Sequence, residues 1–514
     1  MIEEFSLRLS PSEAVDNSFI KKKVSELANT NQKNISAVKV IKRSIDARNR
    51  QIAINLRVLT VWDEEYDGSN SIEPFKHNDV SDAKEVIVIG AGPAGLFAAL
   101  TLIERGFKPI VLERGKDVKR RKADVAELSK NGLLNTESNY CYGEGGAGTF
   151  SDGKMYTRSN KRGNINRVLE LFVLHGANPD ILIESHPHLG TDKLPQIITN
   201  IRNTIDECGG LIRFDSKLTD ITIQSNRIRE ITINEKEKLK TSAVILATGH
   251  SARDIYELLY HKKILIQAKP FAMGVRIEHP RELIDSIQYH GSKDQFLPAA
   301  TYTLATQVNQ RGVYSFCMCP GGTIVPASTG SEELVVNGMS NSMRNSAFSN
   351  SGMAVEISIN DIEKYVCDNP LAGLKMQKQL ERLSWEHSVG NQKAPAQRLV
   401  DFLQNKTSQS LPVSSYIPGV CTSPLHHWLP SEIGKRLQNG FEVFGKSMKG
   451  FITNDAIIVG VESRTSSPVR IPRDVNTFQH VEIENLYPCG EGAGYSGGIT
   501  SSALDGIACA NKIA

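Results

Sequence analysis

The chain has 514 residues, which is too long for one ordinary hydrophobic core, so we expect two or three domains. Its 40% hydrophobic and 23% charged residues are typical of a soluble globular protein, no stretch approaches the ~20 apolar residues of a membrane span, and the start, MIEEFSLRLS, does not resemble a signal peptide. The net charge of +3 does not indicate a nucleic-acid partner, and eight scattered cysteines without a disulfide framework favour a cytoplasmic location.

Residues 1–65 predict a small N-terminal α+β domain of the order βαββ. Its strands are expected at Glu4–Leu9, Asn34–Asp46 and Gln51–Trp62. Ser10 and Glu13 match a capping box, which predicts a helix from this point to Leu27. The polar segment 66–83 predicts a linker.

Residues 84–114 carry the most informative pattern in the chain. The apolar run Val86–Ile89 predicts a buried parallel strand that leads directly into the turn GAGPAG at 90–95. A helix over Ala94–Arg105 and a second strand over Pro109–Leu112 follow. This strand, glycine turn, helix and strand end on the acid Glu113, an order that predicts dinucleotide binding.

Each part of this unit has a physical role. Gly90 permits the tight turn, Gly92 lets the backbone approach a pyrophosphate, and Gly95 lets helix and strand pack closely. The anion is expected on the free N–H groups at the helix N-terminus. The carboxylate of Glu113 can accept hydrogen bonds from ribose hydroxyls.

The rest of the chain predicts one split domain with an insertion. A glycine-rich loop at 142–153 indicates close backbone approach, and the run at 243–249 predicts another buried strand that ends in a small-residue turn. Helices are expected at Asn164–Leu174, Leu194–Glu207 and Leu371–Trp385, and strands at Leu211–Phe214, Ile228–Ile233, Gly312–Met318 and Ala456–Val461. We expect a nucleotide-binding domain at 84–267 and 453–514 around an inserted α+β domain at 268–452.

These motifs, in the order in which they occur along the chain, resemble those of the FAD-dependent oxidoreductases of the glutathione-reductase-like superfamily. More narrowly, the chain is similar to a family of largely uncharacterised bacterial FAD-dependent dehydrogenases. The matching stretches are YGEGGAGTFSDGK (142–154), HPHLGTDKLP (186–195), FAMGVRIEHP (271–280), SFCMCPGG (315–322), APAQRLVDFL (394–403) and VESRTSSPVRIPRD (461–474). The resemblance implies an α/β fold with a Rossmann-like FAD-binding domain and an inserted cap that covers the flavin.

The resemblance also implies which residues hold noncovalent FAD. Gly490 and Glu491 stand where the superfamily often has Gly-Asp, and Ile499 would begin a helix aimed at the flavin. The full set of implied cofactor residues is Gly90, Ala91, Gly92, Pro93, Ala94, Gly95, Glu113, Arg114, Gly145, Gly146, Ala247, Thr248, Gly249, Gly490, Glu491, Gly498 and Ile499. For Arg114, contact with the adenine and a solvated position at the strand end are both open.

Candidate catalytic residues are weaker. His186, His188 and His279 are each either a general acid beside the flavin or a hydrogen-bonded structural histidine. No H-E-x-x-H or paired C-x-x-C motif predicts a metal site.

Two further groups have open interpretations. Arg464 and Arg470 either bind a carboxylate or phosphate of the substrate or brace a loop beside FAD. Cys317 and Cys319, two residues apart on a predicted strand, are either a redox pair or two small buried residues. The basic run 116–122 is interpreted as a solvated helix face rather than a partner surface.

Together these features predict an FAD-dependent oxidoreductase that transfers hydride between a small organic substrate and FAD. The inserted domain has no second G-x-G-x-x-G, so NAD(P)H remains a candidate electron donor without a Rossmann unit of its own. Two alternatives are an RNA-modifying flavoprotein that uses the basic N-terminal domain, and a non-catalytic FAD-binding redox sensor. No membrane partner is expected, and the substrate and oligomeric state stay open.

Overall fold

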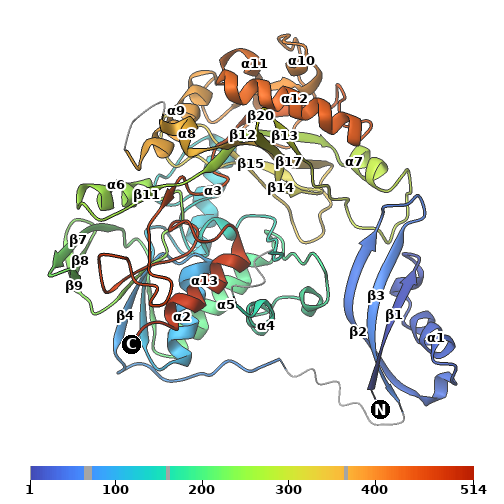
Figure 1. The fold of residues 1–514 in the computed structure, drawn as a ribbon, viewed down its shortest axis with the longest axis horizontal. Helices are drawn as coiled ribbons and strands as arrows, with labels where there is room; N and C mark the ends of the chain where they lie inside the picture. Colours follow the sequence, from blue (N-terminus) through green and yellow to red (C-terminus); the bar gives the residue numbers. More distant parts are fainter. Residues whose placement is uncertain (1, 63–71, 158–162, 364–368) are drawn as a thin grey trace.

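The computed structural model describes residues 2–62, 72–157, 163–363 and 369–514. The chain forms three parts: an N-terminal unit, a parallel-sheet domain and a cap (Figure 1). The cap lies above the parallel-sheet domain in this view, and the N-terminal unit stands beside both. Within the described residues, no helix combines the length and apolar character needed to cross a bilayer.

The N-terminal unit is a three-stranded antiparallel sheet covered by one helix. Its strands are β1 (Ile2–Leu9), β2 (Ile35–Asp46) and β3 (Ala53–Trp62), in the order β1-β3-β2, close to the predicted bounds. Helix α1 (Asn17–Leu27) packs Ile20 and Val24 against Leu56 and Val58 of β3, which gives the unit a core of its own. The short 3₁₀ turn η2 (Gln32–Asn34) leads into β2.

The predicted capping box forms but closes only a short turn. Ser10 N donates to the Glu13 carboxylate at 2.9 Å, and Glu13 N donates to Ser10 Oγ at 3.4 Å. The 3₁₀ turn η1 (Glu13–Val15) ends at Asp16, whose extended backbone interrupts the helix. The Asp16 side chain then accepts from the N–H groups of Ser18 and Phe19 and starts α1 anew.

The parallel-sheet domain contains the predicted dinucleotide-type unit. Strand β4 (Glu85–Ile89), helix α2 (Pro93–Glu104) and strand β5 (Lys108–Leu112) occur in the expected order. The five strands run β22-β10-β4-β5-β6, and all neighbours are parallel. The remaining three strands are β6 (Leu211–Arg213), β10 (Val244–Leu246) and β22 (Leu486–Pro488).

Both faces of this sheet are covered, which explains the nearly continuous apolar character of its strands. On one face the buried helix α2 packs with α4 (Ile165–Leu174), α5 (Leu194–Glu207) and α13 (Ile499–Ala510) in one core. On the other face lie α6 (Arg253–His261) and a second, antiparallel sheet. That sheet consists of β7 (Leu218–Gln224), β8 (Arg227–Ile233) and β9 (Glu237–Lys240).

The cap is built on a seven-stranded sheet in the order β13-β14-β17-β12-β20-β18-β19. Its helix α12 (Ser431–Ser447) lies over the outer face of this sheet (Figure 1). The strands are β12 (Phe271–Pro280), β13 (Ala305–Val308), β14 (Arg311–Cys319), β17 (Phe348–Ile357), β18 (Ala394–Arg398), β19 (Val420–Thr422) and β20 (Ile457–Glu462), with a separate hairpin of β15 (Thr323–Pro326) and β16 (Val336–Met339). The other cap helices are α7 (Arg281–Gln288), α8 (Ile359–Glu363), α9 (Ala372–Glu386), α10 (Leu399–Leu403) and α11 (Leu425–Trp428).

The second boundary of the insertion differs from the prediction. We expected the chain to return to the nucleotide-binding domain at 453, with the apolar strand near 456–461 as its first element. That strand is β20, and it pairs with β12 and β18 inside the cap sheet. The apolar run correctly indicates a buried strand, but burial alone does not specify which of two sheets the strand joins.

The chain crosses between the two larger domains through a two-stranded ribbon. Strand β11 (Gln267–Ala268) leads into the cap, and β21 (Val469–Arg470) leads out of it. The two pair in antiparallel fashion, Gln267 with Arg470 and Ala268 with Val469. The inserted segment therefore leaves and re-enters the parallel-sheet domain at one place.

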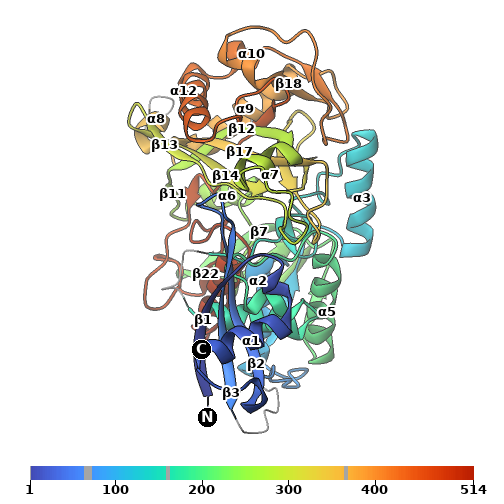
Figure 2. The same cartoon turned by 90° about the vertical axis from the view of Figure 1, so that its right-hand side faces the viewer.

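The N-terminal unit contacts both other parts. The Arg43 N–H donates to the carbonyl of Ile183 at 2.8 Å, and Arg43 pairs with Glu184 at 3.2 Å. The hairpin of β2 and β3 reaches towards the cap (Figure 2), where His290 Nε2 donates to the carbonyl of Ala47 at 2.9 Å. Helix α3 (Val118–Asn131) and the short 3₁₀ turns η3 (Gly146–Gly148) and η4 (Pro179–Leu182) complete the fold.

Candidate functional site

One cavity of about 370 Å³ lies where the strand ends of the parallel sheet face the cap. The ends of β4, β5 and β10 contribute Gly90, Glu113 and Ala247 to its wall. The cap side contributes Phe316, Cys317, Asn337, Arg464 and Thr465. Crevices beyond the carboxyl ends of parallel strands are where α/β folds bind ligands.

The first glycine turn is held in a conformation that only glycine suits. Gly90 has φ +102°, and a Cβ there would lie 2.5 Å from the carbonyl oxygen of Ala247. A Cβ on Gly95 would lie 1.9 Å from the carbonyl oxygen of Gly90, so Gly95 permits the close packing of α2 against the turn. These two glycines are required by the fold itself.

Other glycines face open space. A Cβ on Gly92 would come no closer than 3.8 Å to any neighbour, the Cα of Gly146. At Gly249 and Gly498 an added Cβ would meet no atom within 4 Å. All three line the cavity, so bare backbone faces a space that the chain leaves free for a ligand.

Two helices present their N-termini to the same cavity. Helix α2 begins after Gly92, and α13 begins after Gly498. Neither cap residue has a side chain that can occupy the first free N–H groups of its helix. The cavity therefore has two positions with positive electrostatic potential, each suited to an anion or a developing negative charge.

Family models match all three parts of the chain. Residues 84–263 match a pyridine nucleotide-disulphide oxidoreductase model, residues 270–465 match a model described as FAD-dependent protein, C-terminal domain-like, and residues 1–61 match a domain of unknown function. An uncharacterized protein of Clostridium beijerinckii is 40% identical, over 97% of this chain and 96% of its own length. The chain belongs to this family of FAD-dependent proteins. FAD is its cofactor.

Several solved structures also align with this chain, at low similarity. The halogenase PltM is 11% identical with a TM-score of 0.37, covering 82% of this chain and 66% of its own. The tetracycline destructase Tet(51) is 11% identical with a TM-score of 0.31, covering 83% and 79%. CtdE in complex with FAD is 10% identical with a TM-score of 0.30, covering 83% and 82%. At TM-scores this low, these likenesses carry no argument about the reaction.

Most of the residues implied for FAD in this FAD-dependent protein line the cavity. They are Gly90, Gly92, Pro93, Ala94, Glu113, Arg114, Gly146, Ala247, Thr248, Gly249, Glu491, Gly498 and Ile499. Ala91, Gly95, Gly145 and Gly490 lie behind this wall and support it. For example, Gly145 N donates to the carbonyl of Ala91 at 2.8 Å, which joins the two glycine loops. The open glycine backbone and the two helix N-termini fit a pyrophosphate and a flavin.

Glu113 is more heavily engaged than the sequence indicates. Its carboxylate is buried and accepts from the N–H groups of Ala91, Gly115 and Gly143, each at 2.9 Å. A carboxylate has about four acceptor positions, so one remains for a ribose hydroxyl. Its contact with the adenosine ribose stays a prediction.

Arg114 does not lie in solvent. Its guanidinium pairs with Glu137 at 2.7 Å and Asp254 at 2.9 Å, and it lies 4.2 Å from the ring centre of Tyr142. This pairing orients a flat cation at the cavity wall. The solvated alternative is therefore wrong, and contact with the adenine stays a prediction.

The basic run at 116–122 contains a residue that sequence reasoning missed. Arg121 on α3 is fully buried, and burial lowers its pKa to about 10. Its guanidinium donates to the carbonyls of Asn139, Tyr140 and Glu144. The interpretation of this run as a solvated face is therefore wrong at Arg121, which holds the glycine-rich loop in place.

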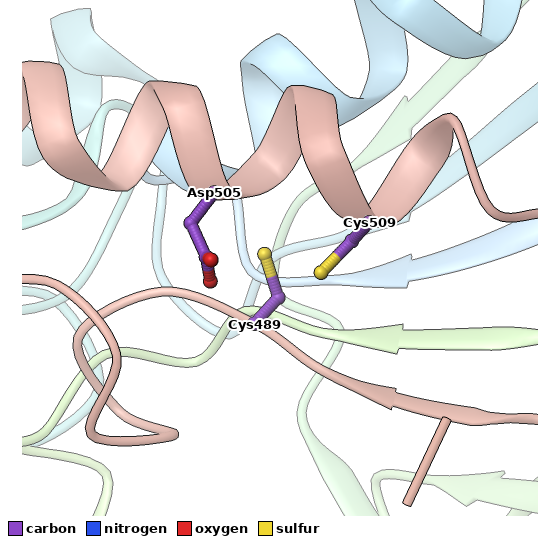
Figure 3. A group of neighbouring side chains, drawn as sticks. All are labelled: Cys489, Asp505 and Cys509. Atoms are coloured by element: carbon purple, nitrogen blue, oxygen red, sulfur yellow. The ribbon is translucent and has the colours of Figure 1, made fainter. Parts of the chain in front are cut away.

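The C-terminal turn is fixed by a buried polar cluster. Cys489, Asp505 and Cys509 point towards one another (Figure 3), with their ligand atoms within 4.8 Å, as metal ligands would be. However, the Arg473 guanidinium lies among them, 2.6 Å from Asp505 and 3.3 Å from Cys509 Sγ. Asp505 also accepts from Gly490 N at 2.7 Å. Because Arg473 already supplies the positive charge, we interpret the cluster as a clamp on the turn that leads to Glu491.

None of the three candidate histidines is among the residues that line the cavity. His279 is completely buried in the cap core, where Nε2 donates to the carbonyl of Phe451 at 2.8 Å and burial lowers its pKa to about 4. His188 contacts the carbonyl of Ser342, and His186 packs on the ring of Tyr156. Burial lowers the pKa of both. These contacts correspond to the structural interpretation of the histidines.

Arg464 and Arg470 do not form a joint anion site. Arg464 lines the cavity, but its guanidinium contacts Glu381 at 2.9 Å and Glu333 at 2.8 Å, so its charge is already compensated. Arg470 is exposed on β21 beside the ring of Tyr495 and is not among the lining residues. The geometry corresponds to the loop-bracing alternative for Arg464.

The cavity contains polar groups that sequence reasoning did not select: Asp152, Lys154, His250 and Asn337. Lys154 lies just after the glycine-rich loop, and its ammonium group donates to the carbonyl of Met318 in the cap. His250 follows Gly249 directly, and burial lowers its pKa. The position of His250 beside a predicted cofactor turn was the available signal, whereas the position of Asn337 depends on how the cap folds.

Proposed function

We propose that this chain is an FAD-dependent oxidoreductase that transfers hydride between a small organic substrate and its noncovalent FAD. The observation that carries the proposal is a cavity whose walls come from both large domains. One wall offers the glycine backbone and helix N-termini that suit FAD. The facing wall consists of cap side chains, which the binding of FAD alone does not require.

FAD supplies the hydride-accepting chemistry when bound, and the chain provides binding, orientation and electrostatics. The backbone at Gly92 and Gly249 leaves room for the cofactor. The N-terminus of α13 stabilises negative charge that develops nearby. The cap covers this region and limits the access of water.

The proposed substrate carries an anionic or carbonyl oxygen. Within the described residues, no Asp or Glu carboxylate lies within 4.0 Å of the Lys154 nitrogen. The nearby Asp152 pairs instead with Arg344 at 2.6 Å. An ammonium group has three N–H donors, and the Met318 carbonyl uses one, so Lys154 can donate to an oxygen in the cavity.

The deciding experiment follows the flavin absorbance without oxygen. The purified holoprotein is mixed in turn with NADH, NADPH and a panel of hydroxy, amino and oxo acids. Bleaching by one of the acids within seconds supports the proposal and identifies the substrate class. If only NADH or NADPH bleaches the flavin, that nicotinamide is the electron donor, and the organic acid would act as the acceptor. If no donor bleaches the flavin, the redox-sensor alternative is favoured instead.

The RNA-modifying alternative has less support from the N-terminal unit. Four of its arginines already contact carboxylates: Arg8 and Arg48 pair with Asp46, Arg43 with Glu184, and Arg57 with Glu4. This pairing reduces the positive potential available to a phosphate backbone. Absence of RNA binding at low salt would eliminate this alternative.

A further inference from the structure

Cys317 and Cys319 lie at an irregularity in strand β14. The antiparallel pairing with β17 is regular up to Phe316 opposite Gly352 and resumes at Cys319 opposite Asn350. At the bulge Cys317 has φ +46°, a left-handed conformation that is uncommon outside glycine. The bulge places Cys317 on the cavity wall, while Cys319 stays fully buried behind it.

The Cys319 thiol donates to the carbonyl oxygen of Cys317 at 3.3 Å, and cationic groups surround the pair. The fully buried Arg276 donates to the Cys317 carbonyl at 2.8 Å and approaches Cys319 Sγ at 3.4 Å. Lys154 donates to the carbonyl of Met318, the residue between the thiols. Arg276 is itself anchored by Glu462 at 2.7 Å.

This environment gives the two thiols different acidities. The neighbouring Cys319 side chain lowers the pKa of the Cys317 thiol, Lys154 and Arg276 lower it further, and burial opposes them. The neighbouring Cys317 and burial raise the pKa of Cys319. The accessible sulfur therefore favours the thiolate and the buried sulfur keeps its proton, an arrangement suited to thiol–disulfide chemistry.

We propose that Cys317 and Cys319 form a redox-active thiol pair that exchanges two electrons with the FAD of the proposed function. In oxidation the two Sγ atoms form a bond and the S–H bond of Cys319 breaks. Two electrons and one proton leave the pair, and FAD is the oxidant that accepts all three. In the reverse direction the disulfide accepts electrons that FAD has received from the substrate, so the pair stores a second pair of reducing equivalents.

Electron counting tests the proposal without a substrate. The holoprotein is first oxidised with diamide, freed of reagent, and titrated anaerobically with dithionite. The wild-type protein is expected to take up four electrons per flavin, two for FAD and two for the disulfide. Cys317→Ser and Cys319→Ser are expected to take up two. Cys421→Ser, a change at a cysteine of β19 outside the cavity, is the matched control and keeps four.

Peptide mapping gives a second measurement that does not depend on the flavin. After diamide, the peptide that contains both cysteines is expected to lose two hydrogens, and dithiothreitol restores them. Uptake of only two electrons by the wild type, with no 317–319 disulfide in the map, would overturn the proposal. If the serine variants fail to fold, the wild-type map decides alone. Four-electron uptake without bleaching by any organic donor would refute the proposed function but support the thiol pair.

Discussion

Gly92 and Gly95 lie three residues apart in one turn, yet an added Cβ would meet different surroundings. At Gly95 it would collide with the carbonyl oxygen of Gly90 at 1.9 Å, whereas at Gly92 its nearest neighbour would be 3.8 Å away. A substitution at Gly95 therefore disturbs the fold. A substitution at Gly92 fills only the space that we assign to the cofactor, which makes the cofactor site testable by a single methyl group.

We predict that Gly92→Ala folds normally but loses FAD. Its backbone, φ −77°, suits alanine, while the new methyl group occupies the place of a pyrophosphate oxygen. The Kd for FAD is expected to rise at least about tenfold, or ~1.4 kcal/mol. Fluorescence titration of the apoprotein measures it. Gly434→Ala, on a cap helix with its nearest neighbour at 3.7 Å, is the control and should bind FAD as the wild type does. A yellow Gly92→Ala protein with unchanged Kd would contradict the assignment.

A second prediction concerns the buried His279. Its Nδ1 has no hydrogen-bond partner among the described residues, and burial lowers the pKa from 6.5 to about 4. Because the folded protein holds this imidazole neutral, its contribution to stability is present above pH ~6.5 and is lost as the pH falls towards 4. The shift corresponds to about 3 kcal/mol.

The measurement is urea unfolding of wild type and His279→Gln at pH 7.5 and 4.5. The free energy of unfolding of the wild type should fall more steeply between the two pH values, by about 2–3 kcal/mol. His261→Gln, at an exposed position, should follow the wild type. Parallel curves for wild type and His279→Gln would show that this imidazole does not contribute.

At the scale of elements, an ionic cluster joins helix α6 of the parallel-sheet domain to helix α9 of the cap. Arg253 of α6 and Arg464 both contact Glu381 of α9, at 2.8 and 2.9 Å. Burial alone would raise the pKa of Glu381, but the two guanidinium groups outweigh it and hold the pKa well below its usual range. The carboxylate is completely buried, and these two arginines balance its charge.

We predict that Glu381→Gln destabilises the protein by about 3–5 kcal/mol, because two buried guanidinium groups lose one of the two carboxylates that they share and keep Glu333. Thermal or urea unfolding measures the change. Glu386→Gln on the same helix removes an exposed pair with Arg382 and should have little effect. Similar stabilities for the two variants would mean that the cluster does not hold the domains together.

Local and non-local features of the chain were predictable to different degrees. The β4–α2–β5 unit follows from short-range spacing, and its bounds agree with the sequence to within one or two residues. The burial of Arg121 does not follow, because a basic helix has the same composition whether one arginine faces solvent or a ring of carbonyls. The position of Asn337 and the sheet to which β20 belongs depend on contacts between distant segments, which a single sequence does not contain.

At the scale of the whole molecule, the N-terminal unit is close to the other domains but remote from the chemistry. It has its own core around Ile20, Val24 and Leu56, and none of its described residues lines the cavity. Its contacts with the rest include Ile52, which packs into the cap core. We therefore expect its role to lie in stability or partner binding rather than in cofactor binding.

We predict that a chain lacking residues 1–71 still binds FAD, with a Kd within about threefold of the full-length value. The Tm should fall, because the cap loses the cover that Ile52 provides. Flavin absorbance after gel filtration and a thermal melt measure both quantities. Loss of flavin from a truncated protein that remains folded by circular dichroism would show that the unit supports the cofactor site.

The paired strands β11 and β21 have a practical consequence for building chimaeras. Since both crossings lie side by side, Gln267 opposite Arg470, a donor cap needs only two splice points a few ångströms apart. Splice points on this ribbon keep β20 with its neighbours β12 and β18. A splice point at 453 would instead separate β20 from the cap sheet. We expect an exchange of caps between relatives at 268 and 469 to change the cap side of the cavity and to leave its glycine-rich side unaltered.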